Sequence, residues 1–380
     1  MKWMKRLICL TLLPVLLIPA RGAELEVSGK SSLLMDAATG QVLLEQNAHQ
    51  PLAPASVTKI MTMLLIMEAI DSGALGWQDM VTASETAAAK GGSQVYLKAG
   101  ETMSVSDMVK SIAVSSANDC ACAMAEHLAG SEEAFVSRMN QRAKELGMEN
   151  THFVNCTGLD DGPDAEKHKT SAYDIGLMSR QLLKYHPDIK KYTTIWMDTL
   201  RNGTFGLSNT NKLIRFYKGA TGLKTGYTAA AGYCLSATAQ RENMELIAVV
   251  MGSPSAKERN AACKQLLDYG FANFALLEPK LEELAQVPVV LGTEGAVPVV
   301  LGQTGGVLVE KARRQAVTTR VRLDTSVTAP VAEGQTLGFF QVLEGDRILQ
   351  EIPLQAQHPV PRLTYGQLCL KVLKKMACCR

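Results

Sequence analysis

Apolar and polar positions between residues 24 and 279 follow two different patterns, which predicts a domain that mixes strands and helices. Four short apolar runs have the length and flanking turns of strands: 32–35, 42–45, 233–239 and 246–251. We expect the first two to form a hairpin around a turn at 36–40, and the last two to lie side by side in one sheet. Helical patterns mark five further segments: 60–70, 108–114, 133–146, 172–185 and 256–274. The first of these is apolar nearly all round, which is typical of a helix buried in a core.

The pattern changes after Pro279, where short alternating segments broken by Gly and Pro continue to about Pro361. This texture predicts a small all-β domain. The hexapeptide Val-Pro-Val-Val-Leu-Gly at 287–292 recurs at 297–302, which indicates two similar strands rather than a functional repeat. We therefore divide the chain into a mixed domain at 24–279 and a β-rich domain at 280–361.

The first 23 residues have the three parts of a secretory signal peptide. Lys2, Lys5 and Arg6 form a basic start, an apolar run follows at 7–19, and small residues at 20–22 suit a cleavage site. The run is too short to span a bilayer comfortably, although an uncleaved interfacial anchor is an alternative. The sequence predicts export, with cleavage after Gly22 or Ala23.

The last segment, 362–380, predicts an amphipathic helix that associates with a membrane surface. On a helical projection one face is apolar and consists of Tyr365, Leu368, Cys369, Val372, Leu373 and Met376. Three lysines, Lys371, Lys374 and Lys375, lie opposite. The alternative is a terminal helix docked on its own β domain. The length and the internal lysines argue against a spanning helix.

Composition excludes several classes of protein and adds no cofactor. Apolar residues make up 47% and charged residues 20%, as in a globular protein, and a net charge of +2 does not predict nucleic-acid binding. None of the nine cysteines forms a Cys-x-x-Cys pair. Cys120 and Cys122 would point to different faces of a helix, and no histidine cluster accompanies them. We expect no metal and no cofactor.

Three short motifs carry the candidate chemistry, in the order Ser56-x-x-Lys59, Ser116-Ala-Asn118 and Lys224-Thr225-Gly226. Each motif alone is weak, because such short patterns arise by chance. Together, in this order and in contexts that suit each, they form a strong signal for serine acyl-transfer chemistry.

Ser56 follows two prolines and precedes the buried helix, so we expect it near a helix N-terminus. There, free amides and the helix dipole favour a developing oxyanion, although such a serine could equally be a helix cap. Lys59 lies one turn further on, on the same face, and is followed by apolar residues. Desolvation lowers the pKa of a buried lysine, which makes Lys59 a plausible general base for Ser56.

The other two motifs suit the binding of a peptide end. The Ser116 hydroxyl and the Asn118 amide could extend a proton relay and hold a substrate amide, or could be a helix cap or loop. Lys224 and Thr225 offer a cation and a hydroxyl to a terminal carboxylate, unless the lysine is solvated in a turn. Gly226 would let a substrate backbone lie close to the strand edge.

With these motifs the chain resembles the low-molecular-mass D-Ala-D-Ala carboxypeptidases, which are penicillin-binding proteins, over nearly the whole mature length. The matching segments are 51–62, 92–96, 115–119, 168–174, 201–203, 222–228 and 231–233. The resemblance implies an α/β (α+β) domain of the β-lactamase/transpeptidase type, with an antiparallel sheet flanked by helices. A small all-β domain and a C-terminal amphipathic helix would follow. The segment between Asn202 and Gly222 is longer than in many members of the family.

The resemblance also implies a role for each site residue. Ser56 would be acylated by the penultimate D-Ala of a peptidoglycan stem peptide and would expel the terminal D-Ala. Water would then release the acyl group. The implied roles are Lys59 as base, Ser116 as proton shuttle, Asn118 as substrate contact, the amides of Ser56 and Tyr227 as oxyanion hole, and Lys224, Thr225, Gly226 and Arg259 as the binding site for the substrate end. β-Lactams would be covalent inhibitors, and the protein would work at the outer face of the cytoplasmic membrane.

Three alternatives share parts of this pattern. A serine β-lactamase would need a Glu-x-x-x-Asn loop, and the chain has Glu166 but threonine four positions on. A non-catalytic wall scaffold would not need every motif residue to be intact. An endopeptidase that cleaves D-Ala cross-links shares all the motifs, so the sequence does not separate it from a carboxypeptidase.

Overall fold

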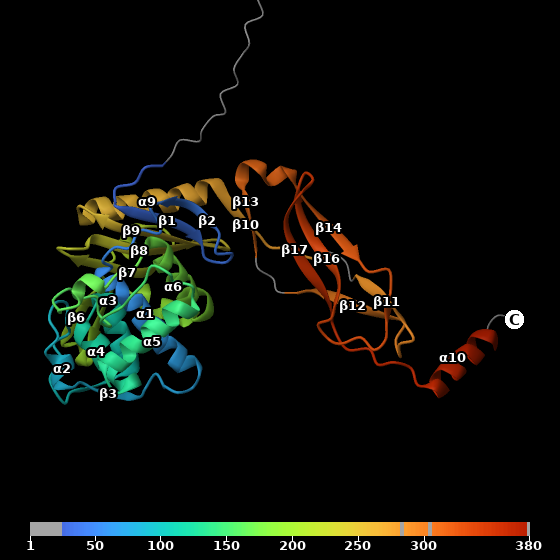
Figure 1. The fold of residues 1–380 in the computed structure, drawn as a ribbon, viewed down its shortest axis with the longest axis horizontal. Helices are drawn as coiled ribbons and strands as arrows, with labels where there is room; N and C mark the ends of the chain where they lie inside the picture. The colour runs from blue at the N-terminus through green and yellow to red at the C-terminus, as the bar shows by residue number, and fades with distance from the viewer. Residues whose placement is uncertain (1–24, 282–284, 303–305, 378–380) are drawn as a thin grey trace, which may run out of the picture.

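The computed structural model describes residues 25–281, 285–302 and 306–377 (Figure 1). The predicted signal peptide lies outside the described residues. Within them, a mixed α/β body is followed by an all-β body and then by a terminal helix, α10. The expected fold class is confirmed.

A five-stranded antiparallel sheet forms the centre of the first body, in the order β2-β1-β9-β8-β7. The strands are β1 (Ser31–Asp36), β2 (Val42–Gln46), β7 (Ala220–Thr228), β8 (Gly232–Arg241) and β9 (Met244–Ser253). The predicted hairpin is β1 and β2, and the predicted adjacent strands are β8 and β9. Successive side chains on a strand face opposite ways, so Leu33 and Met35 pack into one core and Leu34 into the other.

Helices cover both faces of this sheet (Figure 1). The helix α9 (Ala256–Asn273) packs on one face, and most of the others lie on the opposite face, where the larger core is. The helices there are α1 (Lys59–Asp71), α3 (Val105–Ser115), α4 (Asn118–Ala129), α5 (Glu132–Glu145) and α6 (Ala172–Tyr185). Most of α1 is buried, as its apolar pattern predicts, because other helices and the sheet surround it.

Short elements join these helices and strands. They are η1 (Ala55–Thr58), β3 (Met80–Thr82), α2 (Glu85–Ala88), β4 (Thr102–Ser104), η2 (Ala165–Lys167), η3 (Pro187–Ile189), α7 (Lys190–Thr193), β5 (Met197–Leu200), η4 (Arg201–Gly203), β6 (Phe205–Ser208) and α8 (Leu213–Phe216). The longer segment singled out between Asn202 and Gly222 contains β6 and α8. Its strand β6 pairs with β5 in a hairpin beside α3.

The C-terminal body is built on a six-stranded sheet in the order β14-β16-β17-β12-β11-β15. Its strands are β11 (Gln286–Val290), β12 (Ala296–Leu301), β14 (Val317–Leu323), β15 (Val327–Thr328), β16 (Thr336–Glu344) and β17 (Arg347–Ala356), with η5 (Lys311–Ala316) before β14. The repeated hexapeptide forms β11 and β12, which pair with each other, so the interpretation as two similar strands is confirmed. A small sheet of β10 (Phe274–Leu277) and β13 (Val307–Glu310) joins the two bodies across the predicted boundary.

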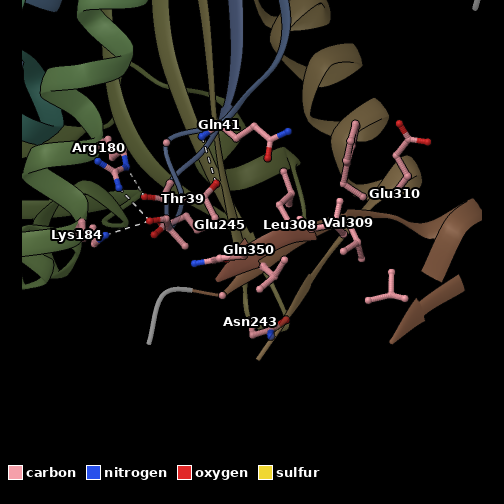
Figure 2. Close-up of a pocket in the computed structure, with 18 of the residues that line it drawn as sticks. Thr39, Gln41, Arg180, Lys184, Asn243, Glu245, Leu308, Val309, Glu310 and Gln350 are labelled. Carbon is pink, nitrogen blue, oxygen red and sulfur yellow. Dashed lines mark hydrogen bonds between the residues drawn. The ribbon is translucent and has the colours of Figure 1, made fainter. Parts of the chain in front are cut away.

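A cleft of about 980 Å³ lies where the two bodies meet (Figure 2). Its walls come from the turn after β1, from α6 and from strands on both sides of the junction. The Arg180 guanidinium on α6 donates to the carbonyls of Ala37 and Ala38, and Lys184 donates to Ala38 as well. None of the residues from the three motifs lines this cleft.

The terminal helix α10 (Tyr365–Ala377) lies at the far end of the β body from the α/β body (Figure 1). Its Leu373 is 64% exposed and its Met376 69% exposed, so these side chains do not pack on the β domain in this structure. No helix in the described part of the chain is long and apolar enough to cross a membrane. The last three residues of the predicted amphipathic segment lie outside the described residues.

Candidate active site

Ser56 lies in the tight turn η1, directly before α1. The expectation of a position near a helix N-terminus is met, but the N-cap of η1 is Pro54 and that of α1 is Thr58. The alternative interpretation of Ser56 as a helix cap is therefore wrong. Ala55 has a φ of 47°, which lies in the left-handed region and indicates that surrounding contacts hold the turn.

A buried hydrogen-bond chain supplies such contacts. The Val154 amide donates to His168 Nδ1, so the neutral ring carries its proton on Nε2 and donates to Thr58 Oγ1 at 2.8 Å. Thr58 in turn donates to the Ala55 carbonyl at 2.8 Å. Burial is the main cause that lowers the pKa of His168 to about 4, with smaller electrostatic contributions from neighbours such as Lys169, so the ring is neutral at neutral pH.

Lys59 is fully buried, and two oxygens lie within hydrogen-bond distance of its Nζ. Nζ lies 3.0 Å from Ser56 Oγ and 2.7 Å from the Thr157 carbonyl. Burial lowers the pKa of Lys59 to about 7, while the side chains of Cys156 and Asp119 act in the opposite direction. A large fraction of Lys59 is therefore a neutral amine at neutral pH, within hydrogen-bond reach of the Ser56 hydroxyl.

Ser116 and Asn118 occupy the junction between α3 and α4. Ser116 ends α3 in the left-handed conformation, with φ 66° and ψ 31°, and Asn118 begins α4. The Asn118 side-chain amide donates to the Gly91 carbonyl at 2.7 Å. Its Oδ1 is buried, and among the described residues no hydrogen-bond partner reaches it. A buried, unpaired acceptor is costly unless a ligand satisfies it.

The third motif lies on β7, at the edge of the central sheet. A Cβ on Gly226 would lie 2.7 Å from the Pro54 carbonyl oxygen and 3.1 Å from the Ser56 amide nitrogen. Only glycine therefore allows β7 to come this close to the turn that carries Ser56. The next residue, Tyr227, is exposed and stacks on Tyr233 of β8 with ring centroids 4.3 Å apart.

Lys224 is a second buried lysine, close enough to Lys59 for the two charges to interact. Burial lowers its pKa well below the usual value, and the positive charges of Lys59 and Arg259 lower it further. Its Nζ donates to the Thr225 carbonyl at 2.8 Å, and the Thr225 hydroxyl donates to Thr210 Oγ1 at 2.7 Å. A bound carboxylate would favour the protonated form of Lys224 and offset the cost of burying its positive charge.

Arg259 lies near the start of α9, beside β8. Its guanidinium donates to the Cys234 carbonyl at 3.5 Å and to Asn260 Oδ1 at 3.0 Å, and lies 5.9 Å from the ring of Tyr233. The structure thus brings Arg259 close enough for its charge to be felt at Lys224. In the part of the chain described, it makes no hydrogen bond with the motif residues of β7.

The turn 155–158 is a part of the site that the sequence reasoning missed. Asn155 Oδ1 accepts from the amides of Thr157 and Gly158 and so folds the turn that presents the Thr157 carbonyl to Lys59. Gly158 has a φ of 84°, and a Cβ there would overlap the Ala55 carbonyl. An asparagine three residues before a glycine is a turn signal, but nothing in the sequence says that this turn contacts α1.

Among the described residues there is no group of three or more His, Cys, Asp or Glu side chains that could hold a metal ion. Cys120 and Cys122 are buried and free, as are Cys156, Cys234 and Cys263.

Two family models match the chain. One, described as D-alanyl-D-alanine carboxypeptidase, covers residues 19–255, and the other, described as penicillin-binding protein 5, C-terminal domain, covers 277–362. The D-alanyl-D-alanine carboxypeptidase DacF of Bacillus subtilis is 41% identical over 94% of this chain and 95% of its own length. The carboxypeptidase DacA of Escherichia coli is 31% identical over 92% and 88%.

Solved structures agree with these matches. Penicillin binding protein 5 of Haemophilus influenzae has a TM-score of 0.77 and 30% identity, over 89% of this chain and 98% of that one. Penicillin-binding protein D2 of Listeria monocytogenes, in an ampicillin-bound form, has a TM-score of 0.59 and 32% identity, over 65% of this chain and 98% of that one.

Proposed function

This chain belongs to the D-alanyl-D-alanine carboxypeptidase family of peptidases, and we propose that it removes the terminal D-Ala of peptidoglycan stem pentapeptides through an acyl-enzyme on Ser56. One observation carries the proposal. Lys59 is fully buried, its pKa is lowered to about 7, and its Nζ lies 3.0 Å from Ser56 Oγ. A serine beside a neutral amine is a nucleophile beside its base.

In the acylation step, Lys59 takes the hydroxyl proton as Ser56 Oγ attacks the carbonyl carbon of the penultimate D-Ala. The carbonyl oxygen becomes an oxyanion, for which the amides of Ser56 and Tyr227 are the donors. The C–N bond then breaks, and the leaving D-Ala amine receives a proton by way of Ser116. The buried position of Ser116 at the end of α3 supports this role as a shuttle.

The terminal carboxylate of the substrate binds to Lys224 and Thr225, with the charge of Arg259 nearby. A carboxylate bound here supplies a negative charge that stabilises protonated Lys224, whose pKa is lowered by burial. The Asn118 side chain contacts the substrate amide, and Gly226 keeps the substrate close to the nucleophile. Water then hydrolyses the ester on Ser56 and regenerates the enzyme. No cofactor enters this sequence of steps.

The family assignment favours a carboxypeptidase over a β-lactamase, and Glu166 is exposed in η2. An endopeptidase acting on D-Ala cross-links uses the same acylation and differs only in the leaving group. β-Lactams are expected to acylate Ser56 because they present a strained amide to the same nucleophile.

We place the enzyme outside the cytoplasm, at the outer face of the cytoplasmic membrane. The predicted signal peptide supports export, and α10 supports a peripheral attachment, since its exposed Leu373 and Met376 can enter a lipid surface.

The test is Ser56→Ala, assayed for D-Ala release from a pentapeptide and for covalent labelling by a penicillin. We expect both activities to be lost. Ser72→Ala, at the other end of α1, is the matched control and is expected to keep both. Labelling of Ser56→Ala at the parent's rate would remove Ser56 from the mechanism.

A further inference from the structure

Glu132, in the first turn of α5, holds two segments that are far apart in the sequence. Its Oε2 accepts from Lys90 Nζ at 2.5 Å. Its Oε1 accepts from the Cys156 amide at 3.1 Å and from the Cys156 thiol at 3.2 Å. The side chain is only 14% exposed, so these contacts are made away from bulk water. One carboxylate thus joins three parts of the chain.

The contact with Lys90 leads to Asn118. Lys90 directly precedes Gly91, whose carbonyl accepts from Asn118 Nδ2 at 2.7 Å. The next residue, Gly92, lies so close that a Cβ on it would be 2.8 Å from the same nitrogen. A shift of the segment at Lys90 would therefore move the acceptor that orients the Asn118 amide.

The contact with Cys156 leads to Lys59. Cys156 directly precedes Thr157, whose carbonyl accepts from Lys59 Nζ at 2.7 Å. The Cys156 carbonyl also accepts from Thr62 Oγ1 on α1 at 2.6 Å. Because Glu132 binds both the amide and the thiol of Cys156, it fixes the position of residues 156–157 relative to α1.

We propose that Glu132 is a positioning residue that aligns Lys59 and Asn118 for acylation of Ser56, acting through Cys156–Thr157 and through Lys90–Gly91. The inference rests on the proposed function, because it takes Lys59 and Asn118 as parts of the acylation site. Glu132, Lys90, Gly91 and Thr157 also line one cavity of about 400 Å³, so the carboxylate and the two segments that it binds meet at one place in the fold.

The electrostatics of the cluster agree with this geometry. Burial opposes the charge on Glu132, but hydrogen bonds from Lys90 and Cys156 hold its pKa below the usual range. Glu132 is therefore ionised at neutral pH. Burial also keeps the Cys156 pKa well above the usual value, so this thiol is a neutral donor to the carboxylate.

The first variant is Glu132→Gln, which keeps the shape of the side chain and one acceptor but removes the charge. The matched control is Glu133→Gln, the next residue of the same helix turn, which is exposed, so any loss of charge at the helix N-terminus is equal in the two. Acylation by a penicillin is measured by stopped flow from pH 5 to 9. The thermal midpoint and the circular dichroism of each variant report the fold.

For Glu132→Gln we expect acylation to slow by about 10- to 100-fold, the usual effect of misplacing catalytic groups by about an ångström. For Glu133→Gln we expect a change within about twofold, as for a surface substitution. The acid limb of the pH profile moves to lower pH in Glu132→Gln, because a loosened Thr157 carbonyl stabilises charged Lys59 less well. The other titratable groups around Lys59 are Cys156, Asp119, Lys224 and His168. Of these, only Cys156 hydrogen-bonds to Glu132, and burial, the largest cause of its raised pKa, is the same in both variants.

A second variant, Lys90→Met, removes the contact that leads to Asn118 and leaves in place the Cys156 amide and thiol that donate to Glu132. We expect it to raise the KM for the peptide and to leave the acid limb in place. The inference is overturned if Glu132→Gln has the rate and acid limb of Glu133→Gln, or if Lys90→Met keeps the parent KM. Failure of the proposed function is a distinct result, since the parent enzyme itself would then form no adduct on Ser56.

Discussion

The two bodies of this molecule differ in what they bury. The α/β body encloses many polar side chains, and Lys59 and Lys224 are among its largest fully buried residues. In the described part of the β body, the one buried polar side chain is Gln341, and the core is made of aliphatic residues and Phe340. Burying a lysine costs stability unless the group has partners or loses its proton. The α/β body therefore carries a cost that the proposed acylation chemistry explains, whereas the described part of the β body buries no lysine.

The largest loss should come from Lys59→Ala. Without its base, Ser56 should be acylated about 10²- to 10⁴-fold more slowly, the usual contribution of a positioned base. The rate of penicillin acylation at pH 8 measures this effect. Lys218→Ala, a lysine on the exposed turn before β7, serves as the control. Near-normal acylation of Lys59→Ala would mean that the buried lysine is structural. The two bodies would then not differ in burying a group for catalysis.

A smaller loss is expected from Gly226→Ala. The added Cβ would lie 2.7 Å from the Pro54 carbonyl oxygen and 3.1 Å from the Ser56 amide nitrogen, so β7 or the Ser56 turn must move. We expect acylation to fall by about 10- to 100-fold, with KM for the peptide raised as well. Gly206→Ala on β6 adds a Cβ where nothing lies within 4 Å, and should be silent. Equal kinetics for the two variants would show that the close approach does not matter.

The pH dependence is a still milder test. In the proposed mechanism Lys59 acts as the base only when neutral. Its pKa is about 7 in the folded protein, so acylation should fall about tenfold for each pH unit below that value. In the unfolded chain the lysine keeps its ordinary pKa of 10.5, so between about pH 7 and pH 10.5 the unfolded state holds more protons than the folded state. The free energy of unfolding therefore gains a contribution from Lys59 that rises with pH through this window.

Lys59→Met isolates that contribution. The variant cannot carry the charge, so its advantage in unfolding free energy over the parent should be greatest below pH 7 and should shrink toward pH 10. Urea unfolding at a series of pH values measures it. A difference that is independent of pH would mean that Lys59 does not titrate differently in the folded state.

The smallest effect on catalysis is expected from deleting residues 363–380. This change should leave acylation of Ser56 as it is, because α10 lies at the far end of the β body. It should abolish co-sedimentation with vesicles that contain anionic lipid. Leu373→Glu, on the exposed face of α10, should weaken sedimentation in the full-length chain. Unchanged sedimentation of the truncated chain would assign α10 another role.

Local pattern was enough to predict much of the fold. The all-round apolar sequence of α1, the hairpin of β1 and β2, and the paired hexapeptides β11 and β12 each follow from a period or a repeat. The three motifs were also visible as short strings. The motifs do not specify how close they lie to one another in space. The sheet sets that distance by placing β7 against the turn that holds Ser56.

Contacts between segments that are distant in the sequence could not be predicted from local patterns. The Thr157 carbonyl lies 98 positions from Lys59 in the sequence, and Glu132 lies 42 positions from Lys90. A backbone carbonyl carries no residue type that a motif could specify. Glu132 itself looks like an ordinary acidic residue in the first turn of a helix, where such residues are common for electrostatic reasons alone. Only the fold shows that it binds two segments of the site.

The most direct test of the central claim is mass analysis of the enzyme quenched during turnover of a D-Ala-D-Ala pentapeptide, followed by peptide mapping. We expect a transient adduct equal to the pentapeptide less one D-Ala, located on the peptide that contains Ser56 and absent from Ser56→Ala. Release of D-Ala with no adduct in the parent, or an adduct on another residue, would contradict an acyl-enzyme at Ser56.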